Sequence, residues 1–319
     1  MAAHALYRRA IPAAAVIQTW HAPDGWAHRR FDWPAPPHVH PRGTLLFQPG
    51  RGDVFEKYLE VFAHWHVRGW HVASFDWRGQ GGSGRCTPAG DCGHVDRFED
   101  YVADLAAFWQ TLPDTRPRVA IGHSMGGHIL LKALVEQAVD PVAAVLVAPM
   151  LGLRAPVGPR FGEGMARLLA RLGPRTRPAW KGNERPHTLQ SRESLLTHDP
   201  ARYADEQWWQ GANAAHRTGP PSWGWVVDAF RSTRELRGDA RLARLHTPVQ
   251  LLVAEADRLV DPAAALAVAA RLPDVELHRF GPEAAHELLR EADPVRARVI
   301  GAIDAFLDAR APAPRTVRA

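Results

Sequence analysis

The sequence has few cysteines and no long apolar run. Its 319 residues include two cysteines, Cys86 and Cys92, which excludes a disulfide-stapled scaffold and supplies no thiolate set for a metal. Two free thiols are expected, and a small-loop disulfide is the alternative. No stretch of about 18 apolar residues occurs, so a transmembrane helix is not expected. Arg8 and Arg9 interrupt the apolar N-terminal residues, so we expect no secretory signal and a cytoplasmic location.

Outside a single segment, the sequence has almost no excess of positive over negative charge. The net charge is +5. Residues 151–182 contain seven basic residues and one acidic residue, Glu163, which is a net charge of +6. No helix-turn-helix, zinc-finger or RNA-binding pattern accompanies this excess, so nucleic acid is not expected as a partner.

Short β-branched runs alternate with longer segments of helical periodicity, as in a mostly parallel sheet covered by helices. An antiparallel edge is expected near residues 27–34. The predicted strands are 43–49, 70–76, 118–124, 143–149, 248–257 and 275–280. The predicted helices are 56–69, 96–110, 126–137, 261–272 and 294–309.

This alternation stops between Pro149 and Leu245, where no strand pattern is present. A structureless loop of that length is improbable in a compact domain, so we expect a partly helical cap over the carboxyl edge of the sheet. The predicted organisation is a core at 1–149 and 246–310, a cap or lid insertion at 150–245, and a flexible tail at 311–319.

A sharp strand-to-helix turn is predicted at Gly122-His123-Ser124-Met125-Gly126, which has the G-x-S-x-G pattern between a strand and a helix. The glycines leave room for the turn and force the serine into a strained conformation. Ser124 would lie at a helix N-terminus, where developing negative charge is favoured. We therefore predict Ser124 as a nucleophile.

A serine nucleophile requires a histidine base and a carboxylate that orients the histidine. Where the serine stands in G-x-S-x-G between a strand and a helix, the chain order of the three residues is serine, acid, histidine. Three carboxylates follow a late strand. Glu255 is expected inside the strand and Asp261 at the N-cap of the next helix, which leaves Asp257 as the acid.

His286 is the predicted base, because it follows Asp257 by 29 positions, room for one helix and one strand. His278 lies inside a predicted strand and is not placed to reach the site. His38 and His40 have no third ligand at metal-site spacing, so no metal is expected.

The oxyanion of an ester intermediate requires hydrogen-bond donors. One predicted donor is the backbone N–H of Met125, directly after the nucleophile. The other is the backbone N–H of Arg51 in the glycine-containing loop 49–53, which follows a predicted strand.

The segments FQPGRGDVFEKYLEVFAHWHVRGWHVASFDWRGQGGSGR, GHSMGG, EADRLVD and AAHELLRE resemble the lysophospholipase and monoacylglycerol lipase branch of α/β-hydrolases, among the serine aminopeptidase-like hydrolases. The resemblance covers roughly 43–150 and 245–310. It implies an α/β-hydrolase fold and the same triad and oxyanion positions. Many lipases of this branch have His-Gly where Pro49-Gly50 stands here. By the same resemblance Asp76, Arg78 and Gly79 hold the active-site loops.

The resemblance implies a serine hydrolase that cleaves carboxylic esters of single-chain lipids without a cofactor. A short-chain carboxylesterase or a proline-iminopeptidase-like aminopeptidase is the alternative, although a basic cap disfavours a substrate ammonium. A catalytically silent ligand-binding protein is the third reading. The oligomeric state is left open.

The cap offers two interpretations, both of which point to a lipid-like substrate. One helix of the cap has apolar residues with arginines between them. Its apolar face could contact the anionic inner face of the membrane, or it could cover the pocket. That helix carries Met165, Leu168, Leu169 and Leu172 with Arg167 and Arg171. The residues predicted to contact substrate are His123, Trp208, Trp209, Trp223 and Trp225.

Overall fold

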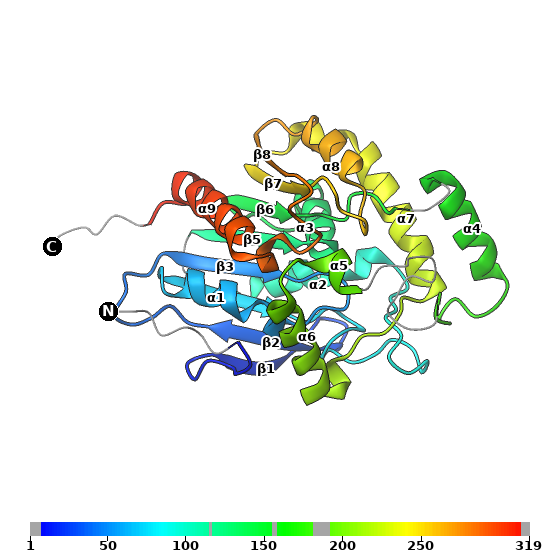
Figure 1. Ribbon diagram of the computed structural model, residues 1–319, viewed down its shortest axis with the longest axis horizontal. Coiled ribbons are helices and arrows are strands. Elements are labelled where there is room, and N and C mark those ends of the chain that lie inside the picture. Colours follow the sequence, from blue (N-terminus) through cyan, green and yellow to red (C-terminus); the bar gives the residue numbers. More distant parts are fainter. Residues whose placement is uncertain (1–7, 115–116, 155–157, 181–191, 314–319) are drawn as a thin grey trace.

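An eight-stranded sheet forms the centre of the computed structural model, which describes residues 8–114, 117–154, 158–180 and 192–313 (Figure 1). The strand order is β1-β2-β4-β3-β5-β6-β7-β8. The strands are β1 (Val16–His21), β2 (Ala27–Trp33), β3 (Gly43–Gln48), β4 (Trp70–Phe75), β5 (Arg118–His123), β6 (Ala143–Val147), β7 (Val249–Ala254) and β8 (Val275–Phe280).

Strands β3 to β8 are mutually parallel, whereas β2 is antiparallel to β4 and β1 is antiparallel to β2. The predicted antiparallel edge is therefore confirmed. Strand β1 was not predicted, because almost all of its side chains are exposed and it lacks the buried half of a strand pattern. Strands β3, β5 and β6 are buried throughout, as expected for parallel strands covered on both faces.

Helices cover both faces of the sheet (Figure 1). One face packs against α1 (Leu59–His66) and α9 (Asp293–Arg310), and the other against α2 (Phe98–Gln110), α3 (Met125–Val135) and α8 (Pro262–Ala269). The helix predicted over 56–69 is divided into a 3-10 turn, η1 (Phe55–Tyr58), and α1.

The segment predicted as a cap contains four further helices in its described part. They are α4 (Pro159–Arg171), α5 (Arg192–Leu196), α6 (Pro200–Ala212) and α7 (Trp223–Gly238). Asp199 and Ser222 cap the N-termini of α6 and α7 through side-chain oxygens. In the cap, residues 155–157 and 181–191 lie outside the described residues, and so do residues 314–319 of the predicted tail.

No helix in the described part of the chain combines the length and the apolar character needed to cross a membrane. Cys86 and Cys92 are both free thiols, so the expectation of unpaired cysteines is confirmed. The chain has the α/β-hydrolase fold, a mostly parallel sheet between two helical layers. In this fold, the carboxyl ends of the parallel strands meet at one edge and bring distant loops together.

Candidate active site

Ser124 occupies the turn between β5 and α3 in a conformation that is rare for a residue with a side chain. Its φ is +52°, the left-handed region. The turn depends on neighbouring glycines: a Cβ on Gly122 would lie 2.7 Å from backbone atoms of Gly126, and a Cβ on Gly126 would lie 2.4 Å from Gln48 O. Only glycine permits this close backbone packing, so the predicted elbow forms as expected.

The structure brings the three side chains predicted as a triad into one hydrogen-bonded chain. Nε2 of His286 lies 2.9 Å from Oγ of Ser124, and Nδ1 of His286 lies 2.6 Å from Oδ2 of Asp257. All three residues are buried, with 8%, 4% and 1% of Ser124, His286 and Asp257 exposed. A histidine held between a hydroxyl and a carboxylate can accept the hydroxyl proton.

Asp257 is oriented by the backbone that follows it. Its Oδ1 accepts hydrogen bonds from the N–H groups of Leu259 at 2.7 Å and Val260 at 3.1 Å, which leaves Oδ2 for His286. Asp261 accepts from the N–H of Ala263 and caps α8, so its expected N-cap role is confirmed. The prediction for Glu255 was wrong, because β7 ends at Ala254, although Glu255 N–H still donates to Phe280 O.

Burial and charge act in opposite directions on the pKa values of this pair. Burial lowers the pKa of His286, but the charge of Asp257 and its hydrogen bond outweigh burial and raise that pKa above its ordinary value. Burial raises the pKa of Asp257, but His286 and the N–H groups of Val260 and Leu259 bring it below its ordinary value. Asp257 therefore remains a carboxylate at neutral pH.

The loop after β3 lies directly against the nucleophile. A Cβ on Gly50 would be 3.3 Å from Cβ of Ser124, so Arg51 follows a residue in contact with the elbow. Trp77 donates its indole N–H to Pro49 O at 2.8 Å, and Asp53 accepts the N–H of Gly50 at 3.1 Å. These two contacts hold the loop that begins at Pro49.

Met125, the other predicted oxyanion donor, is the first residue of α3. The first N–H groups of a helix have no acceptor within the helix, so they can serve a bound oxyanion. Gln80 supports the same region, since its Oε1 accepts the N–H of Gly52 at 2.6 Å. Asp76 accepts the N–H groups of Gly82 and Phe55, which fits the structural role expected for its segment.

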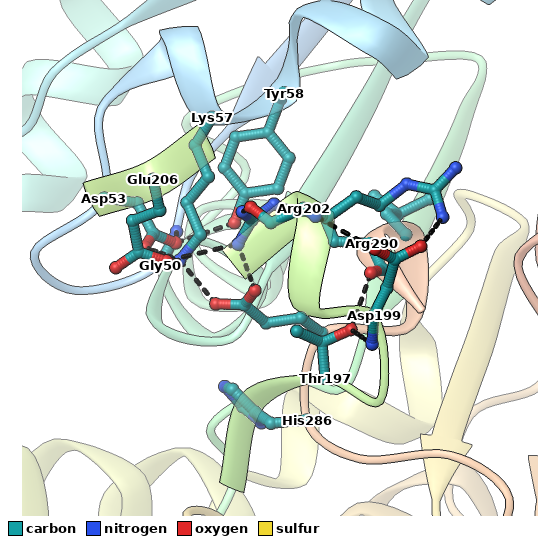
Figure 2. Close-up of polar contacts among 12 residues, drawn as sticks. Gly50, Asp53, Lys57, Tyr58, Thr197, Asp199, Arg202, Glu206, His286 and Arg290 are labelled. Carbon is teal, nitrogen blue, oxygen red and sulfur yellow. Dashed lines mark hydrogen bonds and ion pairs between the residues drawn. The ribbon is translucent and has the colours of Figure 1, made fainter. Parts of the chain in front are cut away.

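A buried ion network lies beside the triad and joins the core to the cap (Figure 2). Nζ of Lys57 lies 2.6 Å from Asp53 and 2.9 Å from Glu206 of α6, and it also binds Glu287, the neighbour of His286. Arg290 binds Glu287 and Glu206 in turn. Burial opposes the charge of Lys57, but the three carboxylates raise its pKa above the ordinary value. The network ties together the loop after β3, the loop that carries His286 and helix α6 of the predicted cap.

The cap also pairs with the histidine loop through its backbone. The N–H of Glu287 donates to Leu196 O at 2.8 Å, and the N–H of His286 donates to Leu195 O at 3.4 Å. Leu195 and Leu196 of α5 are buried. Helix α5 of the predicted cap therefore lies against the loop that carries His286.

His123, predicted to contact substrate, is buried behind the triad histidine. Its Nδ1 lies 2.9 Å from the hydroxyl of Tyr58, and its Nε2 lies 3.4 Å from His286 O. The two histidine rings have their centroids 4.9 Å apart. Burial lowers the pKa of His123, so the ring is neutral and does not repel a protonated His286.

The four tryptophans predicted to contact substrate do not all share the same neighbours. Trp208 is 39% exposed and packs edge-on against Trp209, whose indole N–H donates to Arg8 O. Trp223 lies under the guanidinium of Arg177. Trp225 is buried and contacts Arg51 and Phe98, which places it beside the oxyanion loop.

Sequence reasoning missed the ion network. Lys57 lies four positions after Asp53, a helical ion-pair spacing that could have suggested the first contact. Nothing in the sequence links this pair to Glu206 or Glu287, which lie far along the chain.

Comparison with known proteins identifies the family of this chain. A family model described as serine aminopeptidase, S33, matches residues 39–293. This chain belongs to that family. It is 35% identical to lysophospholipase L2 of Escherichia coli (strain K12) over 232 residues, which are 70% of this chain. The match spans 66% of that relative, slightly less than two thirds of its length.

This S33-family chain is also similar to one further relative and one solved structure that carry lipase names. It is 28% identical to a monoacylglycerol lipase of Mycolicibacterium smegmatis over 43% of this chain and 48% of that protein. A crystal structure of a soluble variant of monoglyceride lipase from Saccharomyces cerevisiae superposes with a TM-score of 0.74 at 20% identity, covering 97% of this chain and all of that one. The superposition supports the fold.

Proposed function

We propose that this chain hydrolyses carboxylic esters of single-chain lipids through an acyl-enzyme intermediate. The observation that carries the proposal is the hydrogen-bonded chain from Ser124 through His286 to Asp257. The strained serine turn at the helix N-terminus also supports the proposal, because attack by this serine creates an oxyanion on the tetrahedral intermediate.

In this mechanism His286 accepts the Ser124 hydroxyl proton while Oγ attacks the ester carbonyl carbon. The negative charge on the carbonyl oxygen is stabilised by the N–H groups of Met125 and Arg51. Collapse of the tetrahedral intermediate breaks the bond to the alcohol, which takes the proton from His286. Water, deprotonated by His286, then attacks the acyl group and releases the fatty acid.

The substrate class rests on the relatives and on the composition of the cap. Lysophospholipase and monoacylglycerol lipase are both names for enzymes that act on single-chain lipid esters.

The two free thiols fit a reducing compartment, so we propose that the reaction takes place in the cytoplasm.

A serine aminopeptidase is the second candidate, because the family model carries that description. Such an enzyme requires a carboxylate for the ammonium group of its substrate. The buried carboxylates nearest in the chain to the triad and the oxyanion loop, Asp53 and Glu287, both bind Lys57. A free lipid ester needs no such carboxylate, which favours the esterase.

The test is a hydrolysis panel with lysophospholipids, monoacylglycerols, p-nitrophenyl esters of rising chain length and amino-acid p-nitroanilides. We expect the highest kcat/KM on long single-chain esters and no turnover by Ser124→Ala, whose fold is checked by circular dichroism. Preference for the anilides would assign the aminopeptidase activity, and preference for acetate esters a short-chain esterase.

We further propose that α4 rests on an anionic membrane surface. Its small residues Ala166 and Ala170 are buried toward α7, whereas one stripe of large apolar side chains faces outward. Figure 1 places α4 at the edge of the molecule, outside α7. The stripe consists of Phe161, Met165, Leu168 and Leu172, which are 58%, 40%, 53% and 69% exposed.

Basic residues flank this stripe. Arg171 and Arg175 are exposed, and Arg167 is exposed while it pairs with Glu163. An apolar stripe beside arginines fits an interfacial helix that approaches lipid head groups of negative charge.

A further inference from the structure

The side chain of Arg51 differs from the other cations around the site. Its guanidinium donates to Gly219 O at 3.1 Å and lies 5.6 Å from the ring centroid of Trp225. Among the described residues, no carboxylate lies at ion-pair distance from it. Lys57 and Arg290, by contrast, each bind two or more carboxylates. Arg51 is thus a half-buried cation whose protein partner is a carbonyl.

Neighbouring charges do not neutralise Arg51. Three cations and three carboxylates of the network bind one another: Lys57, Arg192 and Arg290 with Asp53, Glu206 and Glu287. Asp53 acts on Arg51 only through space, because its oxygens bind Lys57, Tyr58 and the N–H of Gly50. Burial, and then the charge of Arg192, lower the pKa of Arg51 to about 10. The guanidinium is still charged at neutral pH.

Arg51 is also close to the reacting centre. It follows Gly50, which packs against Ser124, so the backbone of Arg51 lies beside the turn that carries the nucleophile. The guanidinium reaches the joint between core and cap, where a Cβ on Gly93 would lie 3.5 Å from Nη1. Gln80 lies between the surroundings of Arg51 and Met125, the other predicted oxyanion donor. Its Nε2 donates to the Tyr101 hydroxyl at 2.7 Å and lies 3.9 Å from Sδ of Met125.

We propose that the Arg51 side chain binds the phosphate of a lysophospholipid and selects phosphorylated over neutral glycerol esters. A guanidinium has five N–H donors in a planar fork that matches phosphate oxygens, and Gly219 O occupies only part of that fork. In a lysoglycerophospholipid the ester and the phosphate are carried by one glycerol unit, so a carbonyl bound by the Arg51 backbone brings the phosphate near its side chain.

The proposal rests on the proposed esterase function and refines its substrate class. A monoacylglycerol presents the same ester but leaves the Arg51 charge without a counterion. A phosphate would supply that counterion through charge-assisted hydrogen bonds, which are about twice as strong as neutral ones. The ring of Trp225, whose centroid lies 5.6 Å from the guanidinium carbon, adds a cation–π contact beside these bonds.

The test compares kcat/KM for a lysophosphatidylglycerol and a monoacylglycerol of the same chain length, both below their critical micelle concentrations. We expect Arg51→Gln to lower the ratio of the two values by about 10- to 100-fold, and Arg51→Lys to restore part of it. Arg244→Gln, which removes an exposed arginine outside the α4 surface, is the matched control and should leave the ratio within about twofold.

Inorganic phosphate gives a second readout. It should inhibit wild-type hydrolysis of the lysophosphatidylglycerol competitively, because both would occupy the Arg51 guanidinium, and should inhibit Arg51→Gln at least about tenfold more weakly. An equal loss on both substrates in Arg51→Gln, with unchanged phosphate inhibition, would overturn the phosphate assignment while leaving the esterase function in place. Absence of wild-type turnover of either lipid would instead refute the proposed function.

Discussion

Nδ1 of His286 lies 2.6 Å from Oδ2 of Asp257, and this contact fixes both the orientation and the protonation of the imidazole. A proton on Nδ1 is held by the carboxylate, so Nε2 is left as the acceptor that faces Ser124 at 2.9 Å. The carboxylate also stabilises the imidazolium that forms during the reaction.

Asp257→Asn should therefore lower kcat by about 10⁴-fold, because an amide favours the wrong histidine tautomer. Asp261→Asn is the matched control, since Asp261 only caps α8 and asparagine is an equally good N-cap. Steady-state kinetics on a chromogenic ester measure both. A dead Asp261→Asn enzyme with an active Asp257→Asn enzyme would show that the acid is misassigned.

The pH dependence of kcat/KM should report the raised pKa of His286. Only the neutral imidazole can accept a proton, so activity should fall as pH decreases through a pKa above the ordinary value of about 6.5. Asp257→Asn removes the charge that raises this pKa, so the acid limb of its residual activity should move to lower pH. An unshifted limb in the variant would contradict the electrostatic role of Asp257.

Gly126→Ala should disrupt the site, because its new Cβ would meet Gln48 O at 2.4 Å and Pro49 O at 2.6 Å. The carbonyls belong to the end of β3 and the oxyanion loop, so we expect at least about 100-fold lower kcat and a lower Tm. Gly301→Ala is the control, as nothing lies within 4 Å of its Cβ and helix α9 should gain up to about 1 kcal/mol. Thermal melts and kinetics compare them, and equal behaviour would argue against the tight packing.

Lys57→Met should destabilise the fold by about 3 to 5 kcal/mol at neutral pH, because buried carboxylates lose their shared cation. Lys57 brings the pKa of Asp53 well below its ordinary value although burial raises it. That stabilisation is present above the unfolded pKa of about 3.9 and is lost as pH falls through the lower folded value. The difference between wild type and variant should therefore persist from pH 7 to about pH 5 and shrink between about pH 5 and pH 2.

Urea denaturation at several pH values measures this difference, and Lys57→Arg is the control that retains the charge. A constant difference across that pH range would mean that Lys57 acts through packing and not through its charge.

The α4 surface should bind anionic vesicles more tightly than neutral ones in co-sedimentation. Binding should weaken at high salt and with Arg167, Arg171 and Arg175 changed to glutamine, because each arginine near the surface adds about 1 kcal/mol that salt screens. Met165→Ser with Leu168→Ser should also reduce binding. Val67→Ser, at a 61% exposed apolar position outside the cap, should not. Equal or absent binding to all vesicles would leave α4 as part of a lid.

The sequence by itself determined the parts of this protein that depend on local rules. Short β-branched apolar runs predicted the parallel strands and helical periodicity predicted the core helices, because a strand buried on both faces is apolar throughout and a one-faced helix repeats its apolar residues. The elbow at Ser124 was predictable because its glycines are required by a turn formed within the same few residues. Asp257 and Asp261 could be separated by their positions relative to a strand end and a helix start.

Only the tertiary structure decided which distant groups meet. The exposed strand β1 carried no burial pattern, so the hairpin at the edge was not predicted. Lys57 meets Glu206 and Glu287, and Arg51 meets Gly219 and Trp225, across separations of well over one hundred residues. Such pairings depend on how distant segments pack against one another. A single sequence contains no periodicity that reports this packing. For the same reason, the sequence showed that the predicted cap is rich in tryptophan but not where each tryptophan lies.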